Sequence, residues 1–392
     1  MRPSGHRLRV SVLSKALVVG AYQRKCELIA AHDDIDLTVL LPPAWAGQRL
    51  ERVHTRGYAL RVIPIRLDGH FHLHHYPTLG QELRRAAPQI LHVDEEPYNL
   101  ATWLAVRQAS RLRPRPHVLF FSWQNILRRY PPPFRYMERD VLNRADAAIV
   151  GSTEARAVWQ AKGFRKPIYV IPQFGVDEDH FRPLPNADKM AASFVVGYAG
   201  RLVPEKGVDV LLKAFSRLPS SARLVIAGSG PAEAALRHLA RCLGIAERVT
   251  FCAPIPSTQM PAFYRSLDVF VLPSRAQPNW KEQFGRVLVE AMACGVPVVA
   301  SRCGEAPNVV GDAGVIFDEE DISALAARLS QLMSQPGRRA ELAQRGRARV
   351  IERYTMRRIA DQTVEVYREL AGDQDSLARR SASVSSSRLA KT

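Results

Sequence analysis

The segment FVVGYAGRLVPEKGVDVLLKAFSRL (194–218) decides the fold class of this chain. Its first residues are mostly apolar and β-branched, which is typical of a buried strand, and they end in a turn at Gly200. Apolar residues at helical spacing follow over 207–218. A strand, a glycine turn and a helix in immediate succession predict an α/β protein with a parallel sheet.

The same alternation of strand and helix patterns extends in both directions from this segment. Further strands are expected toward the C-terminus at 222–228, 248–253, 268–273 and 297–301. Further strands are expected toward the N-terminus at 7–13, 36–41, 58–65, 89–93, 117–122, 147–152 and 168–172. Helical periodicity separates most of these runs, so we expect two doubly wound sheets with helices on both faces.

A stretch rich in proline, aspartate and asparagine, PQFGVDEDHFRPLPNADK (172–189), separates the two series and is the expected linker. The chain has 392 residues, and domains commonly have about 100–200 residues. We therefore predict one domain over 1–180 and a second over 186–355. The last stretch, 373–392, is rich in serine and arginine with few large apolar residues, so it is expected to be a disordered tail.

The composition is that of a globular protein, with 46% hydrophobic and 24% charged residues. No apolar run approaches the ~20 residues that a membrane-spanning helix needs, and a signal peptide is not expected. The five cysteines are scattered, so neither a disulfide framework nor a C-x-x-C metal site is predicted. This pattern favours a reducing, cytoplasmic location.

The chain is strongly basic, with 55 Lys and Arg against 38 Asp and Glu and a formal net charge of +17. Such a surface attracts nucleotide phosphates, nucleic acid or anionic lipid, although the excess also fits a mere preference for arginine. The segment 116–139 mixes aromatic residues with four arginines, Arg128, Arg129, Arg135 and Arg139. It predicts either contact with an anionic membrane or arginine stems that cover apolar surface.

Two turns that follow strands are candidates for phosphate binding. In GYAGRLVPEKG (197–207), Arg201 and Lys206 flank a proline turn before a helix, which is suited to a diphosphate without a metal. The alternative is an ordinary solvated turn. In ARLVIAGSGP (222–231), Gly228 lies in a tight turn whose glycines alone are weak evidence for function.

A third motif, KEQFGRVLVEAMACGVPVV (281–299), places Glu282 in a loop and Glu290 on the helix that FGRV opens. The start of this helix is suited to a phosphate, and the carboxylates are suited to sugar hydroxyls. In the alternative interpretation, Glu282 is a capping residue and Glu290 is exposed. The apolar neighbours of Glu290 argue against full exposure, and a buried carboxylate needs a partner.

The order of these motifs over roughly 194–370 resembles glycosyltransferase family 4. The resemblance implies a GT-B fold, in which two Rossmann-like domains face each other across a cleft. The N-terminal domain would bind the acceptor and the C-terminal domain the nucleotide-sugar, and a helix over 356–372 would cross back to the first domain. It also implies a retaining, metal-independent reaction.

The resemblance further implies the roles of individual residues. The catalytic residues would be Arg201, Lys206 and Glu282. Arg201 and Lys206 would neutralise the diphosphate, and Glu282 would hold the transferred sugar. The donor would be bound by nine residues: Gly200, Gly228, Pro254, Ile255, Phe284, Gly285, Arg286, Val287 and Glu290. No cofactor is expected beyond the co-substrate, a UDP-, GDP- or ADP-linked sugar.

The N-terminal half resembles the family less closely, and its candidates belong to the acceptor side. Gly20 is the one glycine in the first strand–helix loop. Asp94, Glu95 and Glu96 follow a predicted strand and are suited to acceptor hydroxyls or to proton transfer, although acids also favour helix starts. Trp123 and Gln124 occupy the place where family members often have a histidine.

We therefore expect a retaining glycosyltransferase acting on a glycan, lipid-linked saccharide or small molecule. The alternatives are a GT-B nucleotide-sugar epimerase and a non-enzymatic anion-binding protein. No DNA- or RNA-reading motif is present, so nucleic acid is not an expected partner. The expected location is cytoplasmic, with peripheral contact at the inner face of an anionic membrane.

Overall fold

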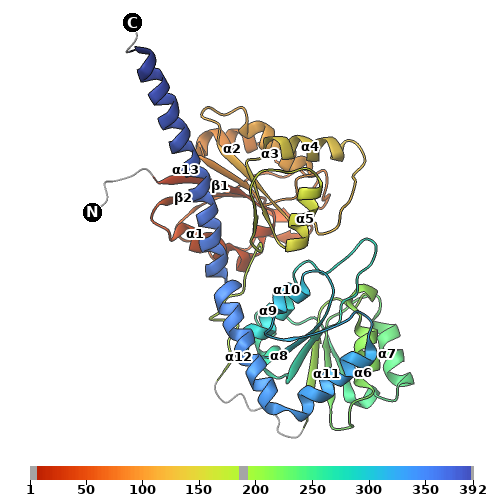
Figure 1. Cartoon of the computed structure of the whole chain (residues 1–392). Helices are drawn as coiled ribbons and strands as arrows, with labels where there is room; N and C mark the ends of the chain where they lie inside the picture. The colour runs from red at the N-terminus through yellow and green to blue at the C-terminus, as the bar shows by residue number, and fades with distance from the viewer. Residues whose placement is uncertain (1–6, 185–192, 390–392) are drawn as a thin grey trace. The chain divides into compact units, whose positions relative to one another are not determined.

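The computed structural model of the chain describes residues 7–184 and 193–389, with side chains through Gly372 (Figure 1). The chain folds as two compact units. The N-terminal unit contains 7–174 and returns from 359 onward, and the C-terminal unit lies within 175–358. The expected boundaries were 1–180 with 356–372, and 186–355. Residues 185–189 of the expected linker lie outside the described residues.

The N-terminal unit is built on a parallel sheet of seven strands. The strands are, in spatial order, β5 (Ala59–Val62), β2 (Ile35–Leu41), β1 (Leu8–Leu13), β6 (Ile90–Val93), β7 (His117–Ser122), β8 (Ala147–Val150) and β9 (Ile168–Val170). Its helices are α1 (Arg24–Ala30), α2 (Leu79–Ala86), α3 (Leu100–Ala109), α4 (Phe134–Arg144) and α5 (Thr153–Ala161). Short elements are β3 (Ala44–Trp45), β4 (Gln48–Arg49), and the 3₁₀ turns η1 (Ala16–Val18) and η2 (Gly20–Gln23).

The C-terminal unit has a parallel sheet of six strands. The strands are, in spatial order, β12 (Val249–Cys252), β11 (Arg223–Ala227), β10 (Val195–Ala199), β13 (Val269–Leu272), β14 (Val298–Ser301) and β15 (Val315–Phe317). Its helices are α6 (Val208–Phe215), α7 (Glu233–Cys242), α8 (Met260–Arg265), α9 (Arg286–Ala293), α10 (Ala306–Val310), α11 (Ile322–Ser334) and α12 (Pro336–Arg353), with the 3₁₀ turns η3 (Pro204–Lys206) and η4 (Ala246–Arg248).

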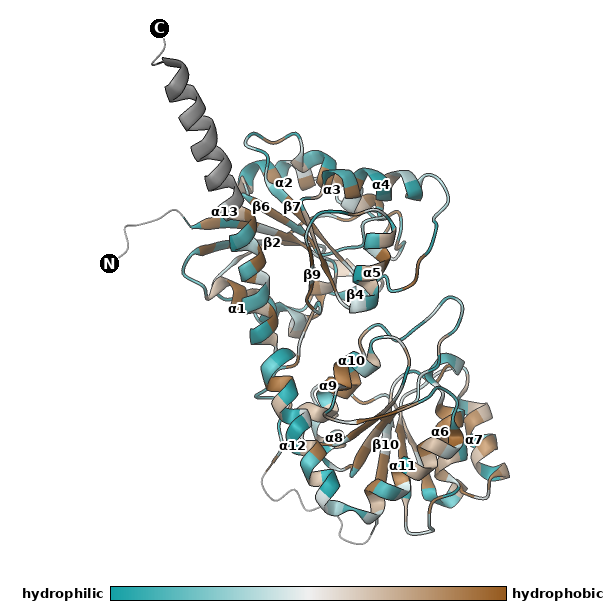
Figure 2. Cartoon of the chain, viewed as in Figure 1, coloured by the Kyte–Doolittle hydropathy of each residue, from teal (hydrophilic) through white to brown (hydrophobic). Residues whose placement is uncertain are grey.

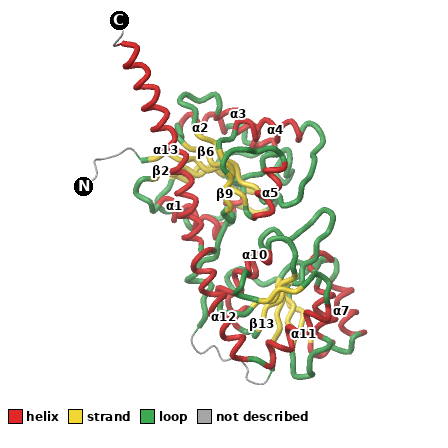
Figure 3. The backbone as a smooth tube through the Cα atoms, viewed as in Figure 1, coloured by secondary structure: helices red, strands yellow, loops and turns green. Residues whose placement is uncertain are grey.

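The strands form the core of each unit because their residues are apolar without alternation. Every residue of β6, β8, β13 and β14 is buried, as expected where helices cover both faces of a sheet. Figure 2 shows the strands of both sheets coloured largely brown, for hydrophobic residues, and Figure 3 shows helices around the strands of each unit. This confirms the two doubly wound sheets predicted from the sequence.

The strand orders identify where a ligand is expected in each unit. In the N-terminal sheet the chain winds outward from β1 in one direction and from β6 in the other, so the order switches between these two neighbours. In the C-terminal sheet the switch lies between β10 and β13. Open parallel sheets bind ligands beyond the carboxyl ends of the strands at such switch points.

The helix α13 (Met356–Leu389) returns the chain to the N-terminal unit from Ile359 onward. Tyr367 is fully buried there, and its hydroxyl lies 2.8 Å from His92 Nδ1 on β6. The backbone is helical through Leu389, whereas a disordered tail was expected over 373–392. No proline or glycine interrupts 373–389, so nothing in this stretch breaks the helix that begins at Met356.

No helix in the part of the chain that the structure describes is long and apolar enough to cross a membrane.

Candidate active site

A cavity of about 360 Å³ lies in the C-terminal unit at the carboxyl ends of β10 and β11. The loop after β12 and the start of α9 complete its wall. It is lined by Ala199, Gly200, Arg201, Ala227, Gly228, Ser229, Pro254, Ile255, Ser257, Met260, Arg286, Val287 and Glu290. The cavity thus brings together predicted donor-binding residues from four separate stretches of the sequence, beside the switch point of this sheet.

The two glycine turns leave the cavity open because no side chain fits there. Gly228 has a φ of +143°, and a Cβ atom on it would lie 1.9 Å from the carbonyl oxygen of Gly200. Gly200 itself has a φ of +155°. The two turns therefore pack backbone against backbone, which lets a ligand approach the main chain closely.

Glu290 belongs to α9, whose first residues Arg286 and Val287 also line the cavity. Its carboxylate is buried and accepts hydrogen bonds from the Tyr264 hydroxyl at 2.8 Å and from Arg286 Nε at 2.8 Å. Burial and the neighbouring Glu290 raise the pKa of Tyr264, so this hydroxyl stays a donor. The buried acid with a partner, inferred from the sequence, is confirmed.

Lys206 and Glu282 do not line the cavity but form an ion pair with each other. Lys206 Nζ lies 2.7 Å from Glu282 Oε2, which also accepts a hydrogen bond from the Ser274 hydroxyl at 2.9 Å. Lys206 Nζ lies 4.7 Å from the centre of the Trp280 ring. The structure therefore joins the turn after β10 to the loop after β13, the two loops at the switch point.

Phe284 and Gly285 also lie outside the cavity wall. Phe284 is buried and packs with its ring centre 5.7 Å from that of Tyr354. Gly285 is the residue before α9 and has a φ of +75°. They precede Arg286 and Val287, which line the cavity, but are not part of its wall themselves.

In the N-terminal unit, Glu95 is held by three buried donors at the switch point between β1 and β6. Its carboxylate lies 2.8 Å from Lys15 Nζ, 2.6 Å from the Tyr76 hydroxyl and 2.5 Å from His74 Nε2. Burial alone would raise the pKa of Glu95, but Lys15 and His74 outweigh it and hold the pKa well below its ordinary value. Glu95 is thus a permanent carboxylate that fixes Lys15.

Only one of the two carboxylate oxygens of Asp94, the residue before Glu95, forms hydrogen bonds with described residues. Its Oδ2 atom accepts hydrogen bonds from the Ser14 hydroxyl at 2.7 Å and from Gln173 Nε2 at 3.0 Å. Its Oδ1 atom is buried and has no hydrogen-bond partner among the described residues. Gln173 Oε1 in turn accepts a hydrogen bond from Trp123 Nε1 at 2.9 Å. The two acceptor-side candidates Asp94 and Trp123 therefore belong to one network.

Glu96 is the third acid of the run after β6, which the sequence analysis assigned with Asp94 and Glu95 to acceptor hydroxyls or proton transfer. Its carboxylate accepts hydrogen bonds from the Ser122 hydroxyl at 2.6 Å and from the Trp123 amide at 2.8 Å. Burial raises the pKa of Glu96 to about 7.

The remaining two acceptor-side candidates, Gln124 and Gly20, form hydrogen bonds with other residues of the N-terminal unit. Gln124 donates from Nε2 to the Ile126 carbonyl at 3.1 Å. The amide of Gly20 donates to Glu51 Oε2 at 2.8 Å, and a Cβ atom on Gly20 would lie 2.3 Å from Val53 Cγ2. Sequence reasoning missed Lys15, His74 and Gln173 as partners because each acts on a carboxylate far from it in the sequence.

A metal site was not expected from the sequence. Among residues 7–184 and 193–372, no group of three or more His, Cys, Asp or Glu side chains is placed to hold a metal ion. His74, which belongs to the histidine-rich stretch after β5, instead contacts Glu95.

Two family models match the chain in succession. The model described as Glycosyltransferase Family 4 matches residues 27–180, and the model described as Glycosyl transferases group 1 matches residues 185–349. This chain belongs to glycosyltransferase family 4. The resemblance noted in the C-terminal motifs therefore extends to the N-terminal half.

Curated relatives of this family 4 chain include two from mycobacteria. A GDP-mannose-dependent alpha-(1-6)-phosphatidylinositol monomannoside mannosyltransferase of Mycolicibacterium smegmatis is 38% identical over 242 residues, which are 58% of this chain and 63% of the relative. A D-inositol 3-phosphate glycosyltransferase of Mycobacterium bovis is 32% identical over 269 residues, 64% of this chain and 54% of the relative. The matches thus span less than two thirds of the relatives' own lengths.

Solved structures similar to this family 4 chain cover nearly all of it. Sucrose-phosphate synthase from Thermosynechococcus elongatus has a TM-score of 0.71 at 21% identity and covers 94% of this chain and 100% of its own. Anabaena Alr3699/HepE in complex with UDP has a TM-score of 0.70 at 20% identity, with 92% and 100% covered. These likenesses show the fold, and the GT-B fold predicted from the sequence is confirmed.

Proposed function

We propose that the chain is a retaining glycosyltransferase that moves a sugar from a nucleotide-diphosphate sugar to an acceptor hydroxyl. The observation that carries the proposal is the cavity of the C-terminal unit. It combines Arg201, the glycine turns at Gly200 and Gly228 and the start of α9 with a buried carboxylate, that of Glu290. This combination suits a nucleoside diphosphate in a chain of family 4.

The donor would be held by cationic groups and amides at its diphosphate and by a carboxylate at its ribose. Arg201 and the amides at the start of α9 would bind the diphosphate, since guanidinium groups and helix starts both favour anions. Glu290 would accept hydrogen bonds from the ribose hydroxyls. The base would lie against the main chain of Pro254 and Ile255. None of these roles uses a metal ion or another cofactor.

The reaction would depend on the Lys206–Glu282 pair. When the donor binds, Lys206 would turn from Glu282 to the diphosphate and neutralise it as the glycosidic bond breaks. Glu282 would then hold hydroxyls of the transferred sugar. The acceptor oxygen would form its bond on the same face, so that the anomeric configuration is retained. Stabilising the departing diphosphate is the main source of rate in this scheme.

The nucleotide is proposed to be GDP, with mannose as the sugar. The M. smegmatis relative is named as GDP-mannose-dependent, whereas Alr3699/HepE is described in complex with UDP. A thermal-shift comparison of GDP, UDP and ADP tests this, because a ligand that binds only the folded chain raises the melting temperature. A larger shift with UDP or ADP would reassign the donor.

The acceptor is proposed to be a sugar or a lipid-linked polyol whose hydroxyl reaches the N-terminal unit. Asp94 supports this, because a buried carboxylate oxygen without a partner is suited to an incoming hydroxyl donor. Trp123, joined to Asp94 through Gln173, would provide an apolar face for the ring. Glu95 would act on this site by holding Lys15 in place. Gln124 and Gly20 would act by fixing the backbone through their hydrogen bonds to Ile126 and Glu51.

Peripheral contact with an anionic membrane is part of the proposal. Leu127 and Tyr136 are each 60% exposed and lie in the arginine-rich segment 116–139. Exposed apolar side chains among arginines suit the interface of an anionic bilayer. Binding to vesicles of anionic lipid, and its absence with neutral lipid, is the expected result. Together with five free cysteines, this supports a cytoplasmic location at the inner face of the membrane.

The decisive test of the function is Lys206→Ala with GDP-mannose as donor. Turnover, measured as GDP released, is expected to fall by about 100-fold or more, because a charge that stabilises the departing group is lost. Lys213→Ala is the matched control, since Lys213 pairs with Asp209 on the surface of α6. Equal activity in the two variants would contradict the proposal. Formation of a new sugar nucleotide without acceptor would instead identify an epimerase.

A further inference from the structure

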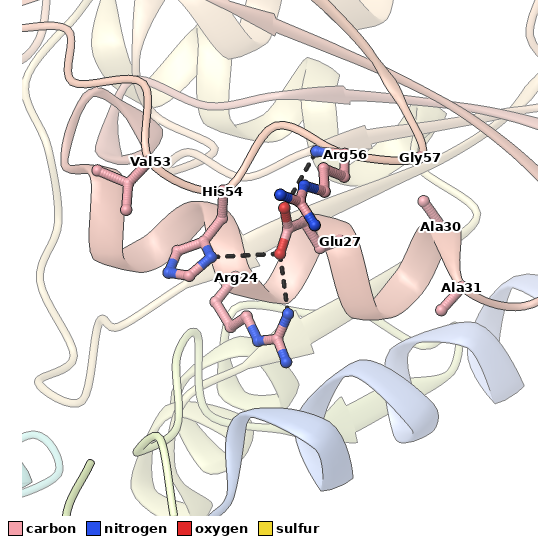
Figure 4. Close-up of a pocket in the computed structure, with 8 residues that line it drawn as sticks. All are labelled: Arg24, Glu27, Ala30, Ala31, Val53, His54, Arg56 and Gly57. Carbon is pink, nitrogen blue, oxygen red and sulfur yellow. Dashed lines mark hydrogen bonds and ion pairs between the residues drawn. The ribbon is translucent and has the colours of Figure 1, made fainter. Parts of the chain in front are cut away.

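A second cavity, of about 470 Å³, lies in the N-terminal unit and contains none of the residues assigned above (Figure 4). One wall is α1, which contributes Arg24, Glu27 and Ala30. The other wall is the segment 53–57, which contributes His54 and Arg56. Both walls come from the same unit, so the cavity is complete within it.

The Glu27 carboxylate organises this cavity. Its Oε2 atom accepts a hydrogen bond from Arg24 Nη1 at 2.9 Å and lies 3.2 Å from His54 Nδ1. Its Oε1 atom accepts the amide hydrogen of Arg56 at 3.0 Å. Figure 4 shows the carboxylate between the His54 ring and the Arg24 side chain, with Arg56 above it. One carboxylate therefore contacts the side chains of Arg24 and His54 and the backbone of Arg56.

Glu27 remains ionised in this setting. Burial alone would raise its pKa, but the amide of Arg56, the side chain of Arg24 and the neighbouring His54 outweigh burial and lower the pKa below its ordinary value. The carboxylate neutralises one positive charge. The cavity still carries a second guanidinium, that of Arg56, so it is cationic overall.

Arg56 is the group that this arrangement leaves available. Its side chain is exposed and forms no ion pair or hydrogen bond with any residue in the part of the chain that the structure describes. Arg24 is 36% exposed in its side chain and uses a single nitrogen on Glu27. Two guanidinium groups with unused N–H groups at one cavity are suited to the oxygens of a phosphate.

We propose that this cavity binds a phosphate group between Arg24, His54 and Arg56. The group is either the free phosphate ion or the phosphomonoester end of a small molecule, for which Ala30 and Val53 offer apolar surface. The proposal concerns binding alone and does not depend on the glycosyltransferase assignment.

A ligand here would contact a segment that supports the first strand–helix loop. Val53 packs against Gly20, and its amide donates to Gln23 Oε1 at 3.2 Å. Gln23 Nε2 also donates to the carbonyl of Leu17 at 2.9 Å. The phosphate site is therefore joined by direct contacts to the loop that carries Gly20.

The test follows the His54 ring by NMR in chain labelled at histidine, with the signal assigned by its loss in His54→Gln. Inorganic phosphate is titrated at fixed pH and ionic strength, with chloride as the balancing anion. The expected result is a saturable shift of the His54 signal. Arg56→Gln should weaken this binding by about tenfold or more, since it removes a charged donor. Its backbone amide still donates to Glu27, so the fold is kept.

Arg85→Gln is the matched control, because Arg85 is an exposed arginine on α2 in the same unit. It should leave the titration unchanged. A shift that does not saturate, or that is the same in Arg56→Gln, would overturn the proposal. A titration with glycerol phosphate in place of inorganic phosphate then distinguishes the two kinds of ligand. Tighter binding of the ester assigns the site to a phosphomonoester, and weaker binding assigns it to the free phosphate ion.

Discussion

At the scale of single residues, the acids of this chain show that surroundings decide what a carboxylate can do. Asp94, Glu95 and Glu96 are consecutive, yet Glu95 has three donors, Asp94 has an unpaired oxygen and Glu96 has a raised pKa. Hydrogen-bond donors favour the charged form of a carboxyl group, and burial disfavours it. The pKa of each residue therefore depends on how many donors it has and how deeply it is buried. Of the three, Asp94 is the one with a buried carboxylate oxygen that has no hydrogen-bond partner among the described residues.

Glu96 provides a pH prediction at the same scale. The folded chain keeps the Glu96 proton up to about pH 7, whereas the unfolded chain loses it near the ordinary pKa of glutamate, about 4.3. The free energy of unfolding should therefore fall as the pH rises from about 4 to 7, by at most about 4 kcal/mol from this group.

The substitution Glu96→Gln should remove that part of the pH dependence, because glutamine resembles the protonated acid in shape and carries no charge. Urea unfolding of both proteins at several pH values measures it. Parallel stability curves for the two proteins would show that Glu96 does not titrate in this range.

At the scale of elements, turns and helix starts build the candidate donor site. The turns at Gly200 and Gly228 follow β10 and β11, and α9 begins at the third side of the cavity. These features were predictable, because a strand, a glycine and a helix start are read from a few neighbouring residues. The short strand β15 was not expected, since three residues at the edge of the sheet carry too little pattern.

The turn at Gly228 gives a second prediction. Gly228→Ala should destabilise the chain more than Gly244→Ala does, and it should weaken nucleotide binding. Both glycines have positive φ, but a Cβ atom on Gly244 meets nothing within 4 Å, whereas one on Gly228 meets the Gly200 carbonyl. The control should cost about 1–2 kcal/mol of unfolding free energy. Chemical denaturation of both variants measures the loss of unfolding free energy. An equal loss in Gly228→Ala and Gly244→Ala would show that the turns at Gly200 and Gly228 are not tightly packed.

At the scale of the whole molecule, the chain passes from one unit to the other twice. In the C-terminal unit, the amide of Val176 donates to Tyr354 at 2.9 Å and that of Met356 donates to Val176 at 2.8 Å. Gly175 lies beside them, where a Cβ atom would come within 2.5 Å of the Tyr354 carbonyl oxygen. The two ends of this unit are therefore paired, and α13 then completes the N-terminal unit.

The packing of α13 gives a third prediction. Tyr367→Ala should lower the free energy of unfolding of the N-terminal unit by about 3–5 kcal/mol, because it leaves a large cavity beside His92. Glu369→Ala, an exposed neighbour on the same helix, should change it by no more than about 0.5 kcal/mol. Guanidinium unfolding of both variants measures the difference, and similar values would mean that α13 does not contribute to the core.

The sequence by itself determined the two doubly wound sheets, the glycine turns after β10 and β11 and the residues at the start of α9. Each of these depends on a pattern within a few consecutive residues. The tertiary structure alone decided that Lys206 pairs with Glu282, 76 positions away, and that Lys15 pairs with Glu95, 80 positions away. Such pairs form because the crossovers bring the carboxyl ends of distant strands to one edge of a sheet, and no local pattern specifies which side chains meet there.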